Sequence, residues 1–385
     1  MLHLFLDNNR GAVIIITLIL VSILVILCTT VASVVTFGGR NAAWQRCRVQ
    51  SFYCAEAGLN KGIVLARADK NWTTGGDGSA THNYPGEDVW YYLYDGGADA
   101  HNVAFGGGTY SVSLRNPSGG VGNVLEVKSE GSVSGVKNSD RKVKVQLRIK
   151  SFAIFGRDSV DIGGNALTDS YNSGQGLYGV NGNIGQEGNV GSNGSVILHG
   201  GSCTVGGEII DNAGITLPPL NIPAFTPSGN VNGSRTLADG IYYFNNITLS
   251  SHEVLETNGN VTIYCNSASF GGQSIIRVNG KLTFYCTGDF KLTGGGLINT
   301  SQKPENFILY CTGSTVKLTG GAEFYGAVYA PNADINLNGG VTYYGAIVGK
   351  IVNVIGGPVI HYDEALKNVF NPAYKVKITS WQEGI

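Results

Sequence analysis

Charged side chains are scarce in this sequence. They make up 14% of the 385 residues, and the net charge is -1. So few and so evenly balanced charges leave no polybasic surface for nucleic acid and no acidic tail. We therefore expect no nucleic-acid partner.

The motifs that hold metals and cofactors are also missing. There is no C-x-x-C and no H-E-x-x-H, and the six histidines are scattered rather than grouped at ligand spacing. Walker, dinucleotide and serine-hydrolase patterns are absent as well, and the Gly-x-Gly pairs have no strand-to-helix context. We expect no metal, no cofactor and no enzymatic activity.

Charge is missing altogether between Gly11 and Phe37, where Ile, Leu and Val dominate. The stretch exceeds the about 20 residues that a helix needs to cross a bilayer, and a helix satisfies its own backbone groups there. A buried core helix would need apolar surroundings on every side. A removable signal has an apolar core of only about 7–15 residues. We predict a leader at 1–10 and a single-pass transmembrane helix at 11–37.

A second helical pattern follows, with apolar residues spaced by three or four, namely Phe52, Ala55, Leu59, Ile63 and Ala66. It predicts an amphipathic extension at 38–70 that continues the membrane helix.

Between 108 and 150 the apolar period changes to two. In 142–150 every second residue is apolar, which is typical of a strand with one buried face. The aromatic-rich segment 77–107 predicts a loop with at most one short strand. We predict a loop and an antiparallel sheet of three or four strands within 71–150, with the sheet packed on the helix stripe.

Glycine, in contrast, is abundant, with 57 residues in the chain. A Gly-rich segment with a Pro-rich spacer occupies 151–228, repeats follow at 229–362, and 363–385 is predicted as a C-terminal cap and strand. The repeats return about every 20 residues. Segments 258–265 and 279–286 match position by position, and 306–311 has the same Tyr-Cys ending.

These repeats predict stacked layers in which like residues lie above like, as in a parallel β-helix, or solenoid. A β-sandwich is the alternative, because its strands also recur every 8 to 12 residues. Overall we predict a mainly β chain, with a transmembrane helix and its amphipathic extension, a small antiparallel sheet and then the parallel β-helix.

The seven cysteines predict packing more than cross-linking. Cys47 and Cys54 are about 10 Å apart along a helix axis, which is too far for a disulfide. Cys265, Cys286 and Cys311 would stack about 4.8 Å apart as an inward ladder. One bridge would fit there, but buried free cysteines behave as small apolar side chains.

Residues 9 to 68 resemble the N-terminal region of PilX-type pilus assembly proteins. The resemblance rests on the apolar span together with Ala55-Glu56-Ala57-Gly58-Leu59. The end of the chain resembles an uncharacterised β-helical domain found behind such N termini. The resemblance implies a non-enzymatic minor-pilin-like subunit of a type IV pilus or related filament. It would be held in the bacterial inner membrane, with its C-terminal domain periplasmic or extracellular.

The resemblance further implies partners and sites. The partners would be the lipid bilayer and other pilin-like subunits, and a prepilin peptidase would cleave after Gly11, between Gly11 and Ala12. The assembly helix would use five residues, namely Phe52, Ala55, Glu56, Leu59 and Ile63.

Two features depart from this pattern. The fifth residue after such a cleavage is Ile16, where typical pilins have Glu. One arginine, Arg10, precedes the span, whereas Arg40, Arg46 and Arg48 follow it, and this order opposes the positive-inside rule.

Three alternative functions stay open. Aromatic-rich repeats would suit a surface glycan, through Tyr242, Tyr243, Tyr325, Tyr343 and Tyr344. Paired carboxylates at Asp158, Asp161 and Asp169 would suit a polysaccharide-active enzyme, although we expect no basic partner near them. The third alternative is a membrane-tethered cytoskeletal β-helix.

Overall fold

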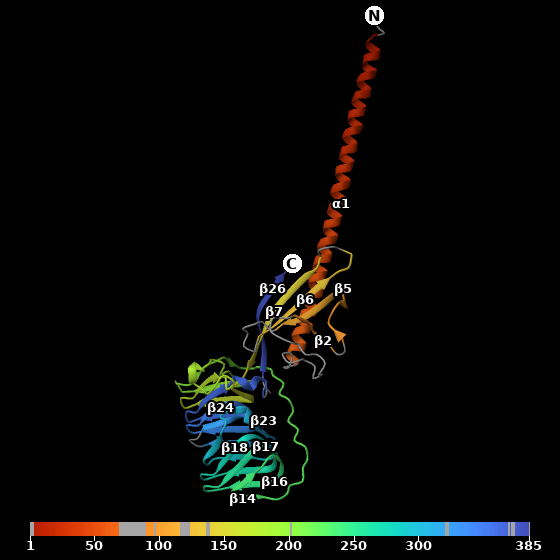
Figure 1. The fold of residues 1–385 in the computed structure, drawn as a ribbon. Helices are drawn as coiled ribbons and strands as arrows, with labels where there is room; N and C mark the ends of the chain where they lie inside the picture. Colours follow the sequence, from red (N-terminus) through yellow and green to blue (C-terminus); the bar gives the residue numbers. More distant parts are fainter. Residues whose placement is uncertain are drawn as a thin grey trace. The chain divides into compact units, whose positions relative to one another are not determined.

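The computed structural model describes residues 4–68, 90–95, 98–115, 124–135, 139–200, 202–319, 323–368, 370 and 374–384. The chain divides into two compact units (Figure 1). Unit 1 comprises Met1–Arg148 and Ile378–Ile385, and unit 2 comprises Ile149–Lys377. The fold is mainly β with one long N-terminal helix and a small antiparallel sheet, as predicted.

Helix α1 (Leu4–Ala68) is continuous over 65 residues. It includes most of the predicted leader as well as the predicted span and extension. The pair Gly38-Gly39 does not interrupt it, although each glycine costs a helix about 1 kcal/mol. The long helical segments on both sides therefore outweigh this local cost.

The antiparallel sheet has six strands in the order β1-β5-β6-β7-β26, with β4 paired to β5. Their bounds are β1 (Tyr91–Tyr92), β4 (Val103–Phe105), β5 (Gly108–Arg115), β6 (Val124–Ser132), β7 (Arg141–Ser151) and β26 (Tyr374–Gly384). A separate two-stranded ribbon joins β2 (Tyr94–Asp95) to β3 (Ala98–Asp99).

The predicted strands of 108–150 correspond to β5, β6 and β7, but the predicted total of three or four is too low. The segment predicted as a loop with at most one strand contains β1 to β4, which are too short to give a periodic signal. The last strand, β26, comes from the far end of the chain. No alternation within 108–150 could predict a partner so distant in sequence.

Unit 2 is built on an 18-stranded sheet, and every strand pair described in it is parallel. Its first strands are β8 (Ile154–Gly163), β9 (Leu167–Tyr171), β10 (Val190–Ser192), β11 (Ser195–His199), β12 (Thr204–Val205) and β13 (Ile209–Ile210). The middle strands are β14 (Val231–Asn232), β15 (Arg235–Leu237), β16 (Gly240–Leu249), β17 (Val254–Phe270), β18 (Ile275–Cys286) and β19 (Phe290–Leu292). The last are β20 (Gly296–Asn299), β21 (Phe307–Cys311), β22 (Thr315–Thr319), β23 (Glu323–Asn338), β24 (Thr342–Ile355) and β25 (Val359–Asp363).

The sequence repeats set the register of this sheet. Asn258 pairs with Asn279, and Cys265 pairs with Cys286, which pairs in turn with Cys311. The prediction that like residues lie above like is therefore confirmed. The β-sandwich alternative is wrong, because a sandwich of this kind needs antiparallel neighbours.

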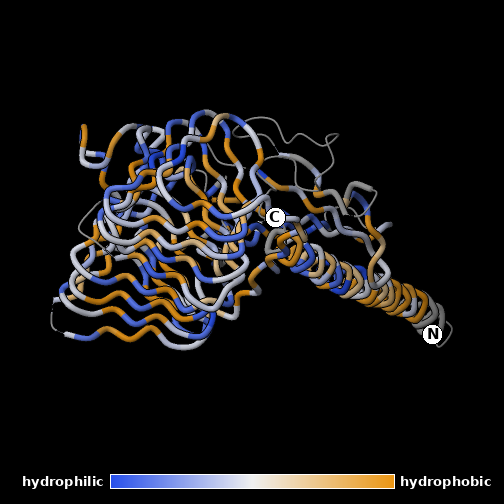
Figure 2. Tube along the Cα trace, turned by 90° about the horizontal axis from the view of Figure 1, so that it is seen from below, coloured by the Kyte–Doolittle hydropathy of each residue, from blue (hydrophilic) through white to orange (hydrophobic). Residues whose placement is uncertain are grey.

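Apolar and polar residues alternate along the stacked strands (Figure 2), and the apolar ones share one buried core. All three cysteines of the ladder are fully buried and free. Hydrogen bonding with Cys265, together with burial, raises the pKa of the Cys286 thiol. These thiols are packed as predicted.

The order of the layers in space differs from their order in sequence. The chain first forms β8 to β13, and it then runs without a strand from 211 to 230 along unit 2 (Figure 1). It winds back from β14 to β25, and β24 and β25 finally pair with β8 and β9.

The 211–230 segment is the predicted Pro-rich spacer, and it lies against the side of the layers. The Tyr329 hydroxyl donates to the Pro218 carbonyl. The Phe225 ring lies 6.0 Å from the Tyr243 ring and 5.8 Å from the Tyr264 ring, centre to centre. The spacer thus wraps the repeats.

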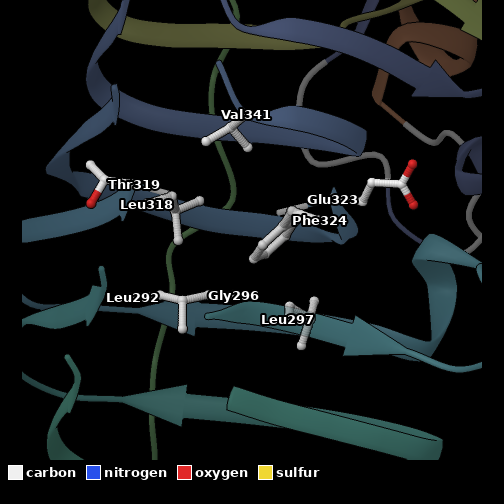
Figure 3. A pocket seen from close by; sticks show the side chains of 8 residues that line it. All are labelled: Leu292, Gly296, Leu297, Leu318, Thr319, Glu323, Phe324 and Val341. Carbon is white, nitrogen blue, oxygen red and sulfur yellow. The ribbon is translucent and has the colours of Figure 1, made fainter. Parts of the chain in front are cut away.

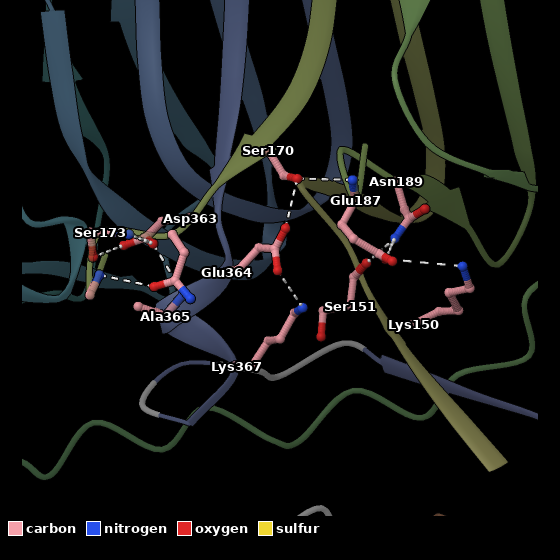
Figure 4. A network of polar contacts seen from close by, with 12 residues as sticks. Lys150, Ser151, Ser170, Ser173, Glu187, Asn189, Asp363, Glu364, Ala365 and Lys367 are labelled. Atoms are coloured by element: carbon pink, nitrogen blue, oxygen red, sulfur yellow. Dashed lines mark hydrogen bonds and ion pairs between the residues drawn. The ribbon is translucent and has the colours of Figure 1, made fainter. Parts of the chain in front are cut away.

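Short 3-10 turns and a polar network complete unit 2 (Figure 4). The turns are η1 (Val180–Gly182), η2 (Pro304–Asn306) and η3 (Glu364–Asn368). Ser170 Oγ donates to Glu364 (2.9 Å) and accepts from the Glu187 backbone N–H (2.9 Å). Asp363 accepts from Ser173, and burial raises the pKa of the Asp363 carboxyl. These bonds hold η3 against β9.

Among the described residues of unit 2, a small void lies between the layers, with a volume of about 20 Å³ (Figure 3). Its lining includes Leu297, Leu318, Phe324 and Val341, and it is mostly apolar. A space of this size without several polar partners stays dry. Its lining atoms therefore lack contacts that a methylene group would supply.

We expect V341I to stabilise the protein by up to about 1 kcal/mol, because the added methylene fills this void. The control is V354I in the same layer. Val354 is fully buried, and overpacking there should cost about 1–3 kcal/mol. Thermal unfolding of both variants by circular dichroism tests this. Equal destabilisation of the two would contradict it.

Candidate functional site: the apolar helix and its seat on the sheet

The N-terminal half of α1 exposes its apolar side chains. Large apolar residues from Val13 to Phe37 are between 50% and 71% exposed. By length and composition this is the helix in the described part of the chain that is able to cross a membrane. Its polar side chains are satisfied within it, since Ser22 Oγ donates to the Leu18 carbonyl (2.7 Å) and Thr36 Oγ1 to the Ala32 carbonyl (2.7 Å). Such back-bonding suits a polar group in an apolar solvent.

The C-terminal half of α1 packs against β5 and β6 of its own unit. The residues that it buries are spaced by three or four, namely Ser51, Cys54, Ala55, Gly58, Leu59, Gly62 and Ile63. The prediction that the sheet packs on the helix stripe is confirmed.

Glycines on both elements allow this close approach. A Cβ on Gly62 would lie 2.9 Å from Val127 Cγ1 and 3.0 Å from Val112 Cγ1. A Cβ on Gly131, in β6, would overlap the Ser51 carbonyl oxygen and lie 2.5 Å from the Ala55 backbone nitrogen. We call this contact the helix seat.

The seat changes the role expected of the predicted assembly residues. Ala55, Leu59 and Ile63 are buried in it, while Phe52 and Glu56 are half-buried at its border. The first three therefore stabilise unit 1 itself. Gly11 and Ala12 lie in α1, and their side chains fall outside the described residues.

Sequence reasoning did not assign a role to the seat glycines. The pair Gly58 and Gly62, one helical turn apart, was the available signal, because small residues at this spacing let another element approach a helix closely. The partner glycine Gly131 could not be recognised from sequence, since its need for space arises only once β6 crosses α1.

A shallow groove adjoins the seat on the side of the β4–β5 turn. It has a volume of about 490 Å³ and lies between α1 residues 45–54 and the turn at Phe105 and Gly106. Cys54 Sγ donates to the Phe105 carbonyl (3.3 Å), and burial raises the pKa of the Cys54 thiol. Val49, Tyr53 and Phe105 leave their apolar surfaces exposed there.

A buried carboxylate organises the polar face of the sheet. Glu126 is 2% exposed and accepts from Lys144 (3.0 Å), Gln146 (2.9 Å) and Arg115 Nε (2.9 Å). Burial alone would raise the pKa of Glu126. The hydrogen bonds from Gln146, Arg115 and Lys144 outweigh that effect and lower it.

Each of the three carboxylates considered for an enzyme has its own basic or aromatic partner, which corrects our expectation that none lies near. Arg157 Nε pairs with Asp158 Oδ1 (2.9 Å), and His199 Nε2 with Asp161 Oδ1 (3.1 Å). Asp169 accepts from the Tyr178 hydroxyl (2.6 Å) and pairs with the buried His361. Three separate pairs do not form one carboxylate dyad.

The tyrosines considered for glycan binding do not lie together on one surface. Tyr343, Tyr325 and Tyr344 are buried, so they serve the core. Tyr242 is half-buried. Tyr243 stacks in a row with three tyrosines that were not predicted, in the order Tyr243, Tyr264, Tyr285 and Tyr310, with ring centres 5.3, 4.7 and 5.1 Å apart. Tyr243 is 38% exposed.

Comparisons with known proteins say little about activity. Residues 221–369 match a family model described as "Domain of unknown function (DUF7305)". No curated protein matches the chain. Among solved structures, the chain is similar to the crystal structure of the competence-associated pilin ComZ from Thermus thermophilus. The identity is 12%, covering 88% of this chain and 98% of that chain, with a TM-score of 0.24. A similarity this low carries no argument about fold or function.

We expect G131A to loosen the seat and to destabilise unit 1 by at least about 1–3 kcal/mol, because backbone atoms of α1 occupy the space of the new methyl group. G38A is the matched control. No atom lies within 4 Å of its added Cβ, and alanine favours a helix. Thermal unfolding of the full chain in detergent would measure both. A G131A variant as stable as G38A would contradict the seat.

The pH dependence of stability should identify Glu126 as an ionised group. Its pKa in the folded protein is lowered, below the about 4.3 of an unfolded chain. The carboxylate therefore stabilises the fold above that value, and this contribution is lost as the pH falls through the folded pKa. We expect E126Q to cost about 1–3 kcal/mol at pH 7 and progressively less below about pH 4.

E130Q is the control for this experiment, because Glu130 is on the same strand and pairs with Lys128 (3.1 Å) but has a side chain that is 38% exposed. Its effect at pH 7 should be under about 1 kcal/mol. Chemical unfolding at several pH values measures both variants. An E126Q deficit that stays constant down to pH 3 would rule out the ionised carboxylate as its cause.

Proposed function

We propose that this chain is a non-enzymatic, membrane-anchored, pilin-like structural subunit that contributes to a type IV pilus or a related filament. One observation carries the proposal. A single helix combines an uncovered apolar half at 13–37 with a second half seated on its own antiparallel sheet. Such a helix joins a folded unit to an apolar environment without a flexible link.

The same apolar half would serve both storage and assembly. A helix that is apolar all round is stable in lipid, and it is also stable among other apolar helices, because packing replaces the lipid contacts. The bilayer and other pilin-like subunits are therefore the proposed partners. The proposed contact surface is 13–37, since the seat occupies Ala55, Leu59 and Ile63.

The PilX-type resemblance supports the finer assignments. We place the protein in a bacterial inner membrane as a single-pass subunit, with unit 2 on the outer side, and we propose cleavage between Gly11 and Ala12. Long domains cross membranes largely regardless of flanking charge. Arg40, Arg46 and Arg48 therefore do not oppose this orientation decisively.

Unit 2 is the part proposed for display. In-register parallel pairing of successive repeats, such as Tyr325 with Tyr344 and Gly326 with Gly345, supports a β-helical solenoid. A solenoid presents long, regular side faces that suit contact with other surfaces.

Glycan binding is the second candidate function. The stacked tyrosines 243, 264, 285 and 310 form a row of nearly parallel rings, which suits the flat faces of sugar rings. Phe225 of the spacer covers part of this row. A glycan array in which Tyr285→Ala binds like the unchanged chain would remove this candidate.

Photo-crosslinking tests the leading proposal. A benzoylphenylalanine replaces Leu27, in the exposed apolar half, or Ile241, which is 61% exposed in unit 2. In sheared filaments we expect the probe at 27 to cross-link to other pilin-like subunits, because the helices would pack together there. The probe at 241 is the control for random proximity.

Absence of the chain from the filament fraction, together with cross-links from position 27 to lipid alone, would overturn the filament role and leave only an anchor. N-terminal sequencing of the mature protein tests processing separately. An intact Met1 would exclude cleavage at Gly11.

A further inference from the structure

Three arginines follow the apolar half of α1 and remain outside the seat. Arg40 and Arg46 are exposed, and Arg48 is half-buried. From Asn8 to Ala55 the sequence contains no acidic residue. The positive charge of this segment is therefore not balanced by its own helix.

The arginines surround the helix. At about 100° of rotation per residue, Arg46 and Arg48 point about 240° and about 80° away from Arg40. They begin about 4.5 Å beyond Phe37 along the axis and end about 16.5 Å beyond it, at 1.5 Å per residue. We call Arg40, Arg46, Arg48 and the enclosed Trp44 the basic collar.

Side chains of a helix lean toward its N-terminus, which here is the direction of the apolar half. The structure contains an example of this inside the collar. The Arg48 guanidinium lies over the Trp44 ring, 5.0 Å from the ring centre, one turn closer to that half. The lean moves the charges of the collar toward the zone of about 5–8 Å that headgroups occupy on each side of the hydrocarbon.

From this geometry we propose that the basic collar binds the phosphate groups of anionic phospholipids at the end of the span. The complementarity of charge identifies the ligand, because the charged groups of the collar are all cationic and its neighbour along the helix carries no charge. Tryptophan prefers the same interface, where its ring is apolar and its N–H reaches water. Guanidinium groups pair with phosphate oxygens through two parallel hydrogen bonds.

This inference rests on the membrane anchorage in the proposed function and is independent of filament assembly. It gives the arginines after the span a role of their own. By binding phospholipid headgroups at the C-terminal end of the span, they would fix how deeply the helix is inserted in the bilayer.

Native mass spectrometry of the full chain in neutral detergent tests the collar. The probes are phosphatidylglycerol and phosphatidylcholine with identical acyl chains. We expect tighter binding of phosphatidylglycerol, and a loss of roughly fivefold in its affinity for each arginine removed in R40Q/R46Q/R48Q. Phosphatidylcholine binding should stay unchanged.

The matched control removes the same charge from exposed lysines of unit 2, as K281Q/K303Q/K317Q, and should keep the preference. Equal binding of the two lipids, or a preference that survives in the arginine variant, would overturn the proposal. Displacement of phosphatidylglycerol by inorganic phosphate alone would also overturn it, because a free anion would then be the ligand.

The experiments can disprove lipid binding by the collar and the filament role independently of each other. A chain that prefers phosphatidylglycerol but never enters filaments keeps the collar and loses the assembly role. A chain that enters filaments but shows no preference for phosphatidylglycerol keeps the assembly role and loses the collar. Thermal unfolding of the full chain, including unit 1, which contains the three arginines, checks that R40Q/R46Q/R48Q is folded.

Discussion

The parallel pairing of β24 with β8 is the contact on which unit 2 depends. It joins Ile347 to Ile154 and Val352 to Val160, residues that are almost the whole unit apart in sequence. Without it, the layers that begin at β8 and those that end at β25 would be two separate stacks, each with an exposed edge. Such edges are sites of aggregation. Long-range parallel pairing is also slow to form, so this contact is expected to limit the folding rate.

This closure also explains how unit 2 can be inserted into the antiparallel sheet. The chain enters unit 2 from β7 and returns to β26, and these two strands are neighbours in that sheet. A domain inserted between neighbouring strands must begin and end at nearby points, and the pairing of β24 and β25 with β8 and β9 provides this. Within unit 2, the Glu208 carboxylate joins the two ends of the inserted chain, since it lies 3.2 Å from Lys150 and 3.6 Å from Lys377. Burial alone would raise the pKa of Glu208, but the two lysines lower it.

The parts of the fold that sequence could predict are those in which neighbours in space are also repeats in sequence. Cys265, Cys286 and Cys311 share one environment, so they share one residue type, and their stacking follows directly. The pairing of β24 with β8 follows the same logic, because 153–156 (AIFG) repeats 346–349 (AIVG) and Ile154 and Gly156 pair with Ile347 and Gly349. Sequence reasoning missed this repeat because the two copies are almost the whole unit apart in sequence. The helix seat, in contrast, escapes this logic. Ala55, Leu59 and Ile63 form an apolar stripe whether they face a sheet of their own chain or a helix of another subunit, and only the position of β6 decides between these.

The apolar half of α1 imposes the strongest constraint on where this protein exists. Its 17 large apolar side chains between Val13 and Phe37 are each at least half exposed. Covering them is worth on the order of 20 kcal/mol, which exceeds the about 5–15 kcal/mol that holds a typical domain folded. Within the described residues, the seat and the core of unit 2 already bury their own apolar side chains. In the proposed function the cover comes from lipid or from other apolar helices, and the exchange between these two is the step from storage to assembly. Because both environments are apolar, the exchange itself involves little change in hydrophobic free energy. Its direction would then be decided by groups next to the helix, and the arginines that follow the span are the charged groups closest to its C-terminal end.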